Sequence, residues 1–136
     1  YRIVQNEGLG LAIQGSREWT GYCATVEVEP HLCSRAGLAV HCQGMRRFYA
    51  LLLSRSGEVE LVRWFDEPAI LARAEFKWKL DEKHTLSLCY DEGELIGSVD
   101  GKELIRAHDE RLPVGAVALV CEEGRTRFGP VTVEPL

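Results

Sequence analysis

The sequence lacks the features that mark nucleic-acid-binding and membrane-spanning proteins. Its 16 Lys and Arg stand against 21 Asp and Glu, which gives a net charge of −5, and no basic cluster is longer than the pair Arg46 and Arg47. Because phosphate binding needs a concentrated basic surface, neither nucleic acid nor an anionic membrane is an expected partner. No window approaches the roughly 20 apolar residues of a membrane span, and no segment has the basic start and apolar middle of a signal peptide. We therefore expect a soluble protein.

The sequence also lacks the local signatures of common catalytic sites. Nucleophilic catalysis needs Ser or Cys beside His, and acid–base catalysis needs two carboxylates in one pocket. These residue types are scattered along the chain, and neither G-x-S-x-G nor H-E-x-x-H occurs. The sequence therefore predicts no catalytic residue within this chain.

Cysteine is present, but in no pattern typical of a metal or redox site. The five cysteines form no C-x-x-C pair, and an odd number cannot all pair within one chain. Most of them lie in apolar, strand-like runs, which favours small buried thiols and a cytoplasmic location. The alternative is a disulfide between Cys23 and Cys42 on neighbouring strands.

A zinc site would have to combine His31, Cys33, His41 and Cys42. The spacing H-x-C followed by H-C matches no common zinc finger or ribbon. His41 and Cys42 are also adjacent in an expected strand, so their side chains should point to opposite faces. We expect no bound metal and no cofactor.

What the sequence does contain is a succession of short strands. No segment carries a helical stripe over 11 or more residues, and most segments of five to nine residues end in a turn signal. Four turns are expected at residues 54–58, 91–94, 99–102 and 122–125, where Gly can supply positive φ. The expected strands are residues 2–5, 9–14, 21–29, 38–42, 48–54, 59–65, 69–74, 85–90, 94–99, 102–107, 116–121 and 126–134.

A dozen strands cannot form one flat sheet, so two antiparallel sheets packed face to face are the economical arrangement. The fold class is all-β, with residues 1–136 as a single β-sandwich domain. Alternation places Val26, Leu38, Val40 and Cys42 on the inward face and leaves His41 on the other side. The chain begins without Met and enters a strand at once, so we expect a piece of a longer protein.

The strand FYALLL, residues 48–53, is apolar on both faces, so both faces should be covered. If its even-numbered residues continue the inward face, its odd-numbered residues line an opposite, concave face. A sugar-binding surface needs aromatic rings to stack on the sugar and polar side chains to bond its hydroxyls. The candidate ligand-binding residues on that face are Tyr49, Trp64, Arg47, Glu60 and His41. A one-residue change of register would instead bury Tyr49.

The order of several recurring elements resembles the laminin-G-like, concanavalin-A-like jelly-roll domains appended to bacterial hydrolases. The likeness covers residues 19–134, and its elements are Trp19 and Tyr22 at the start of a strand, AGLAV, RFYALLL, the strand approach at Trp78, VDGK, VGAVAL and FGPVTV. More narrowly, the chain resembles the C-terminal sandwich of ADP-ribosylglycohydrolase (crystallin J1-like) family proteins. Many relatives have Asp where this chain has Gly129, and the resemblance implies that this acid helps to hold calcium in them; without it we expect no bound calcium.

The resemblance implies a non-catalytic accessory module of a bacterial hydrolase. Its partners would be an upstream catalytic domain of the same chain and, as in related sugar-binding sandwiches, a carbohydrate or glycan-like ligand. Two other classes of function stay open. One is a structural domain for docking or self-association, and the other is a sandwich-fold glycoside hydrolase.

Overall fold

The computed structural model describes the backbone of residues 2–15 and 19–136 and, within them, the side chains from residue 10 onward. These residues form antiparallel strands, as the alternating sequence pattern predicts. Among them, no helix is long and apolar enough to cross a membrane. The strands are β1 (Arg2–Gln14), β2 (Tyr22–Leu32), β3 (Arg35–Gly44), β4 (Arg47–Ser54), β5 (Glu58–Phe65), β6 (Glu67–Glu75), β7 (His84–Asp91), β8 (Glu94–Val99), β9 (Lys102–His108), β10 (Ala116–Phe128) and β11 (Thr132–Pro135).

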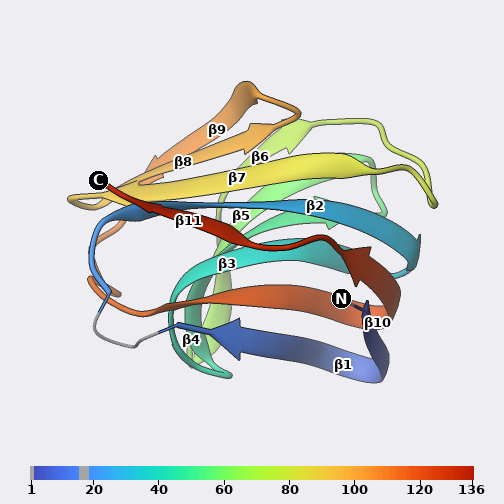
Figure 1. Cartoon of the computed structure of the whole chain (residues 1–136), viewed down its shortest axis with the longest axis horizontal. Helices are drawn as coiled ribbons and strands as arrows, with labels where there is room; N and C mark the ends of the chain where they lie inside the picture. The colour runs from blue at the N-terminus through green and yellow to red at the C-terminus, as the bar shows by residue number, and fades with distance from the viewer. Residues whose placement is uncertain (1, 16–18) are drawn as a thin grey trace.

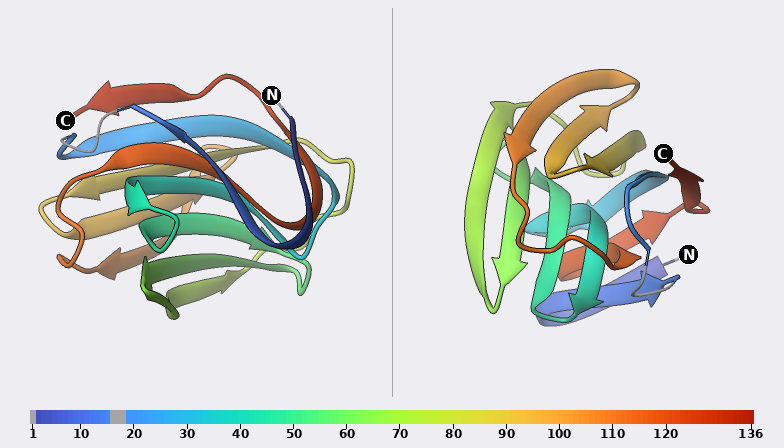
Figure 2. Two further views of the ribbon diagram at one scale, coloured as in Figure 1. Left: turned by 90° about the horizontal axis from the view of Figure 1, so that it is seen from below. Right: turned by 90° about the vertical axis from the view of Figure 1, so that its left-hand side faces the viewer.

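The strands pack as two layers (Figure 1; Figure 2). The six-stranded layer has the order β1-β10-β3-β4-β5-β6, and the five-stranded layer has the order β11-β2-β7-β8-β9. One long strand joins them, because β10 pairs with β3 over residues 116–122 and with β2 over residues 125–128. The predicted two-sheet antiparallel β-sandwich of the jelly-roll type is confirmed.

Two of the predicted tight hairpins carry the expected backbone geometry. Asp100 and Gly101 have φ of 52° and 83° between β8 and β9, and Glu92 and Gly93 have φ of 47° and 88° between β7 and β8. Positive φ at both central residues is the requirement of a type I′ hairpin turn. These turns fix the register of β7, β8 and β9.

The predicted turn at residues 122–125 is wrong. This stretch lies inside β10, and the ladder with β2 changes register between Arg125 and Thr126. Gly124, with φ of 149°, is needed there because a Cβ would lie 1.6 Å from the Leu32 carbonyl oxygen. The glycine therefore allows a close backbone approach where the strand passes between layers, and the sequence could not distinguish that from a turn.

Both faces of β4 are buried, as predicted, but in the opposite register to the one that exposes Tyr49. Tyr49, Leu51 and Leu53 belong to the main core between the layers. Phe48, Ala50 and Leu52 face the other way. There they form a second cluster on the outer face of the six-stranded layer, whose buried members are Ala39, Cys42, Phe48, Ala50, Leu52, Val62, Ala118 and Val120, with Leu11 and Trp64 packed against them.

The expectation that Cys42 faces inward and His41 outward is also wrong. The ladder between β3 and β4 shifts register between Val40 and Gly44, and His41 has φ of 50°. This irregularity turns His41 into the core directly after the inward Val40 and moves Cys42 to the second cluster. A β-bulge of this kind breaks alternation, and nothing in the sequence marked it.

A disulfide joins Cys23 of β2 to Cys89 of β7, which lie directly opposite each other in the ladder. Both the expectation of thiols throughout and the alternative Cys23–Cys42 bridge are therefore corrected. Cys33, Cys42 and Cys121 are buried and form no disulfide. Because disulfides are rare in cytosolic proteins, the bond weakens the expected cytoplasmic location.

Candidate functional site

The structure separates the five candidate residues of the predicted sugar-binding face. Trp64 and Glu60 lie together on the outer face of the six-stranded layer. Tyr49 and His41 are both fully buried on the inner side. Arg47 is exposed at the start of β4, where its guanidinium pairs with Asp66 at 3.2 Å and lies 4.5 Å from the centre of the Phe65 ring. The predicted set therefore does not form one surface, because β4 has the opposite register and β3 is bulged.

A compact polar cluster surrounds the two candidates that remain on the outer face. We call it the Trp64 face and define it by Arg35 of β3, Glu60 and Trp64 of β5, Arg73 of β6 and Glu122 of β10. These strands bring the residues together because Glu60 pairs with Arg73 in one ladder and Glu122 pairs with Arg35 in another. Sequence reasoning missed Arg35, Arg73 and Glu122. Their positions opposite one another depend on a strand order that the sequence does not specify.

Arg35 is the centre of this cluster. Its Nε and Nη2 donate to the two carboxylate oxygens of Glu122 at 3.1 and 2.8 Å. Its Nη1 donates to Oε1 of Glu60 at 3.1 Å, and the second oxygen of Glu60 lies 3.8 Å from Nε of Arg73. The Ser34 hydroxyl also donates to Glu122 at 3.1 Å. Both carboxylates are thus held in fixed orientations, since charge-assisted, forked hydrogen bonds are strong and directional.

The electrostatics of the pair reinforce this geometry. The hydrogen bond from Arg35 lowers the pKa of Glu122, and the Glu122 carboxylate raises the pKa of Arg35. The side chains of Arg35 and Glu122 are each 20% exposed, so solvent still reaches the pair. The Arg35–Glu122 pair is therefore ionised at neutral pH, and its carboxylate oxygens can serve as hydrogen-bond acceptors.

Trp64 provides the aromatic component of the face. Its ring stacks on Phe48 at 5.0 Å between centroids, and the Arg35 guanidinium lies 5.3 Å from the indole centroid. The indole is partly exposed, whereas Phe48 beneath it is fully buried. The Trp64 ring is therefore held in place by the buried Phe48 ring and lies next to the Arg35 guanidinium.

On the inner side, Tyr49 ties the segment after β9 to the sheet. Its hydroxyl donates to Oδ1 of Asp109 at 2.5 Å and accepts the backbone N–H of Leu112 at 3.1 Å. Arg63 forms an ion pair with the other oxygen of Asp109. Burial, together with the Asp109 hydrogen bond, raises the pKa of Tyr49. This network is structural and places the loop of residues 109–115.

His41 serves a similar role. Its Nδ1 lies 2.7 Å from the carbonyl oxygen of Leu112, and its Nε2 lies 3.2 Å from that of Thr20. Its backbone N–H donates to the hydroxyl of Tyr22 at 2.9 Å, and its ring packs on Tyr90 at 4.1 Å. Burial lowers the pKa of the imidazole. His41 is therefore a buried core residue whose burial disfavours the protonated form, and it faces the two loops at this end of the sandwich.

The four residues of the candidate zinc site, His31, Cys33, His41 and Cys42, do not form a metal site. His31 contacts the carboxylates of Glu29 at 3.1 Å and Asp81 at 2.7 Å, whereas His41 is buried among tyrosines. Among the described side chains, no group of three or more His, Cys, Asp or Glu is placed to hold a metal ion.

No known family pattern matches the chain, and no curated protein is similar to it in sequence. Solved structures do share its fold. The carbohydrate-binding module CBM66 from Bacillus subtilis superposes with a TM-score of 0.88 at 14% identity, covering 96% of this chain and 84% of that one. Sheep galectin-11 gives 0.64 at 12% identity, covering 96% and 99%, and a homodimeric agglutinin from chicken liver gives 0.65 at 14% identity, covering 93% and 99%. At these identities the likeness establishes the jelly-roll sandwich fold.

Proposed function

We propose that this chain is a non-catalytic saccharide-binding module whose ligand lies on the Trp64 face. One observation carries the proposal: Arg35 holds the carboxylates of Glu60 and Glu122 in place beside the partly exposed indole of Trp64. A sugar ring presents apolar C–H groups that can pack on an aromatic ring and hydroxyl groups that need polar partners. The Trp64 face supplies both kinds of contact on rigid strands.

The structural comparisons support this proposal at the level of the fold. One similar structure is a carbohydrate-binding module and another is an agglutinin. Since one fold can carry many functions, the chemistry of the Trp64 face has to supply the rest of the argument. The charges there nearly balance, because two arginines face two glutamates, which favours a neutral saccharide.

We also propose that the module accompanies a hydrolase domain, as the sequence resemblance to ADP-ribosylglycohydrolase-associated sandwiches implies. The catalytic domain of the same chain would then be its partner. In that arrangement this sandwich brings the catalytic domain to a glycan, and the bond-breaking residues lie outside residues 1–136.

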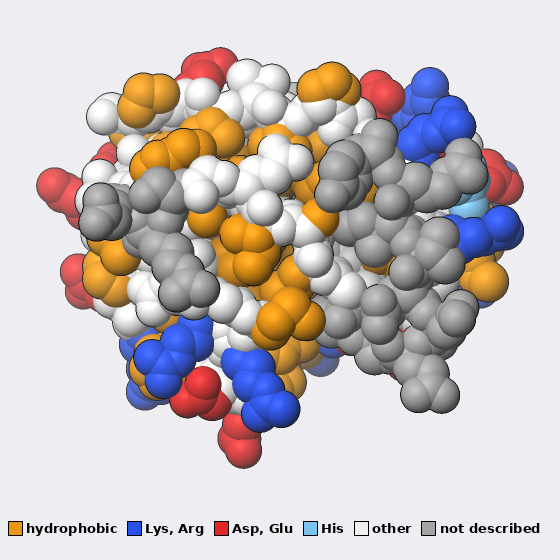
Figure 3. All heavy atoms as spheres, turned by 60° about the horizontal axis from the view of Figure 1, so that its bottom comes forward, with side chains coloured by type: hydrophobic (Ala, Val, Ile, Leu, Met, Phe, Trp, Pro, Cys, Tyr) orange, Lys and Arg blue, Asp and Glu red, His pale blue; other side chains and the backbone are white. Residues whose placement is uncertain are grey.

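Docking is the competing function, because apolar side chains are exposed on the same outer face. Ile13 of β1 and Ile70 of β6 are 46% and 42% exposed, and each is paired with a member of the second cluster. With the β1 side turned forward, hydrophobic side chains gather across the middle of the visible surface (Figure 3). Large exposed apolar patches commonly mark protein contacts.

The test is a screen of the chain against neutral polysaccharides by affinity electrophoresis and a glycan array. We expect binding that falls by at least about tenfold in Trp64→Ala and in Glu60→Gln, since tenfold corresponds to about 1.4 kcal/mol of lost contact. Arg106→Ala, which removes an exposed side chain from β9 in the other layer, is the control and should bind as the wild type does. Absence of glycan binding by the folded protein, with association to the catalytic domain lost in Ile13→Ser and Ile70→Ser, would favour docking instead.

A further inference from the structure

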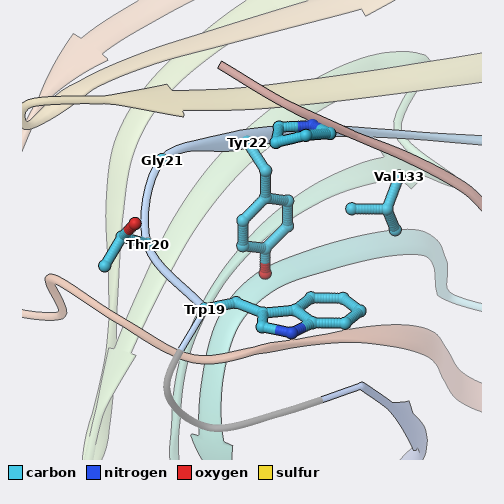
Figure 4. Close-up of a pocket in the computed structure, with 6 residues that line it drawn as sticks. Trp19, Thr20, Gly21, Tyr22 and Val133 are labelled. Atoms are coloured by element: carbon cyan, nitrogen blue, oxygen red, sulfur yellow. The ribbon is translucent and has the colours of Figure 1, made fainter.

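Two adjoining cavities lie at one end of the sandwich, where the segment before β2 meets the end of β11. The first cavity has a volume of about 480 Å³ and is lined by Trp19, Thr20, Gly21, Tyr22, Val133 and Pro135. In Figure 4 the Tyr22 ring points toward Trp19, and Val133 stands across the cavity from Thr20. The volume lies within the range of small-molecule sites.

A second cavity of about 800 Å³ adjoins the first, because both are lined by Thr20 and Gly21. We call the two together the end groove. The rest of the second cavity is lined by Tyr90, Asp91, Glu92, Glu110, Pro113 and Leu136. The end groove shares no residue with the Trp64 face, so it is a separate place for a ligand.

The aromatic part of the end groove is preorganised. The Tyr22 hydroxyl donates to the Gly115 carbonyl at 2.9 Å, and the Gly115 N–H donates to the Trp19 carbonyl at 2.9 Å. The Trp19 and Tyr22 rings meet edge to face at 5.8 Å. Gly15 leaves room for the indole, since a Cβ at that position would lie 2.5 Å from the ring. Rigid walls lower the entropic cost of binding.

The chemistry of the end groove differs from that of the Trp64 face. Trp19 is 37% exposed and presents its indole to the first cavity. The second cavity is lined by three carboxylates, of which Glu110 contacts His108 at 3.3 Å, while Asp91 and Glu92 are exposed. None of the described residues that line either cavity is Lys, Arg or His. An anionic ligand would be repelled here, and a cation would be attracted by both the carboxylates and the indole face.

We propose that the end groove is a second binding site, selective for an amine-bearing saccharide such as a glucosamine oligomer. The apolar face of a sugar ring packs between Trp19 and the side chains of Val133 and Pro135. The protonated amine faces Asp91 and Glu92, and ring hydroxyls bond the Thr20 hydroxyl and the remaining carboxylate oxygens. The charge of the amine sets the selectivity, because the same sugar in its N-acetylated form lacks the cation.

The test uses the Trp64→Ala variant, so that the Trp64 face cannot contribute and the outcome is independent of the function proposed for it. Fully deacetylated chitosan oligosaccharides and N-acetylated chito-oligosaccharides of equal length are titrated by calorimetry at pH 6. We expect binding of the deacetylated oligomer and at least tenfold weaker binding of the acetylated one. Adding Trp19→Ala should abolish binding, and adding Asp91→Asn with Glu92→Gln should weaken it at least tenfold.

The control for nonspecific attraction is Glu67→Gln with Glu75→Gln, which removes two exposed charges from β6. This change should leave the affinity within about twofold of the starting value. The proposal is overturned if the two oligomers bind equally, if neither binds, if binding survives Trp19→Ala in a protein with an unchanged melting temperature, or if the β6 variant weakens binding as much as the groove variant does.

Discussion

Arg35 and Glu122 form a forked ion pair between β3 and β10, with Nη2 to Oε2 at 2.8 Å and Nε to Oε1 at 3.1 Å. The two residues are direct partners in the ladder that joins these strands. The pair lies at the end of the segment of β10 that pairs with β3, just before the segment that pairs with β2 in the five-stranded layer. It therefore stabilises the crossing of the strand between layers and at the same time orients the polar part of the Trp64 face.

Glu122→Gln should lower the free energy of unfolding by about 1–3 kcal/mol, because a charge-assisted bond to Arg35 is lost. It should also leave the Arg35 charge balanced only by Glu60, which is shared with Arg73. The affinity of the face should then shift from neutral toward acidic saccharides. Urea unfolding and parallel titrations with a neutral and a sulfated polysaccharide check both parts, and unchanged selectivity would show that this pair does not tune the face.

Tyr49→Phe should reduce stability by about 1–2 kcal/mol, since Asp109 and the Leu112 N–H each lose one hydrogen bond while the ring remains. Because Tyr49 faces the core, the neutral-glycan affinity should stay within about twofold of the wild type. Chemical denaturation and glycan titration measure the two effects. A selective loss of glycan binding with stability intact would place Tyr49 at the ligand, contrary to its burial.

Reduction of Cys23–Cys89 should cost about 2–4 kcal/mol of stability, because the bond restricts the unfolded chain between two positions separated by 66 residues. Thiol titration of the denatured, unreduced protein should give three reactive groups, rising to the five of the sequence after reduction. The matched control is Cys33→Ala, which removes a buried free thiol and should leave the effect of reductant unchanged. Five reactive groups before reduction would contradict the disulfide.

His41 should make the protein less stable in mild acid. Because burial lowers its pKa in the folded state, the unfolded chain takes up a proton first as the pH falls below the ordinary value of about 6.5. Its contribution is thus fully present above that pH and is lost as the pH falls through the folded pKa. His41→Asn, which retains a residue able to adopt φ of 50°, should show a shallower loss of stability between pH 7.5 and 5.5. Equal slopes for variant and wild type in urea unfolding would exclude this role.

The all-β sandwich could be determined from the sequence by itself. The signals were the period-2 alternation along most strands, the turns at Asp100–Gly101 and Glu92–Gly93, and the apolar run at residues 48–53. These are local signals, because backbone φ and the alternation of side chains depend on near neighbours. The double burial of FYALLL could be predicted for the same reason. Trp64 and Glu60 could be found as site candidates because they alternate on one face of one strand.

The tertiary structure decided everything that depends on pairing between distant strands. The bulge at His41 turned that side chain into the core, and the crossing of β10 at Gly124 replaced an expected turn. Only the strand order brought Arg35 next to Glu122, and only the β2–β7 register set Cys23 against Cys89. A one-residue change of register reverses both faces of a strand without changing its sequence pattern, so the inward side of Tyr49 could not be read locally. The second layer fixes that choice, because Tyr49, Leu51 and Leu53 pack with its side chains in the main core.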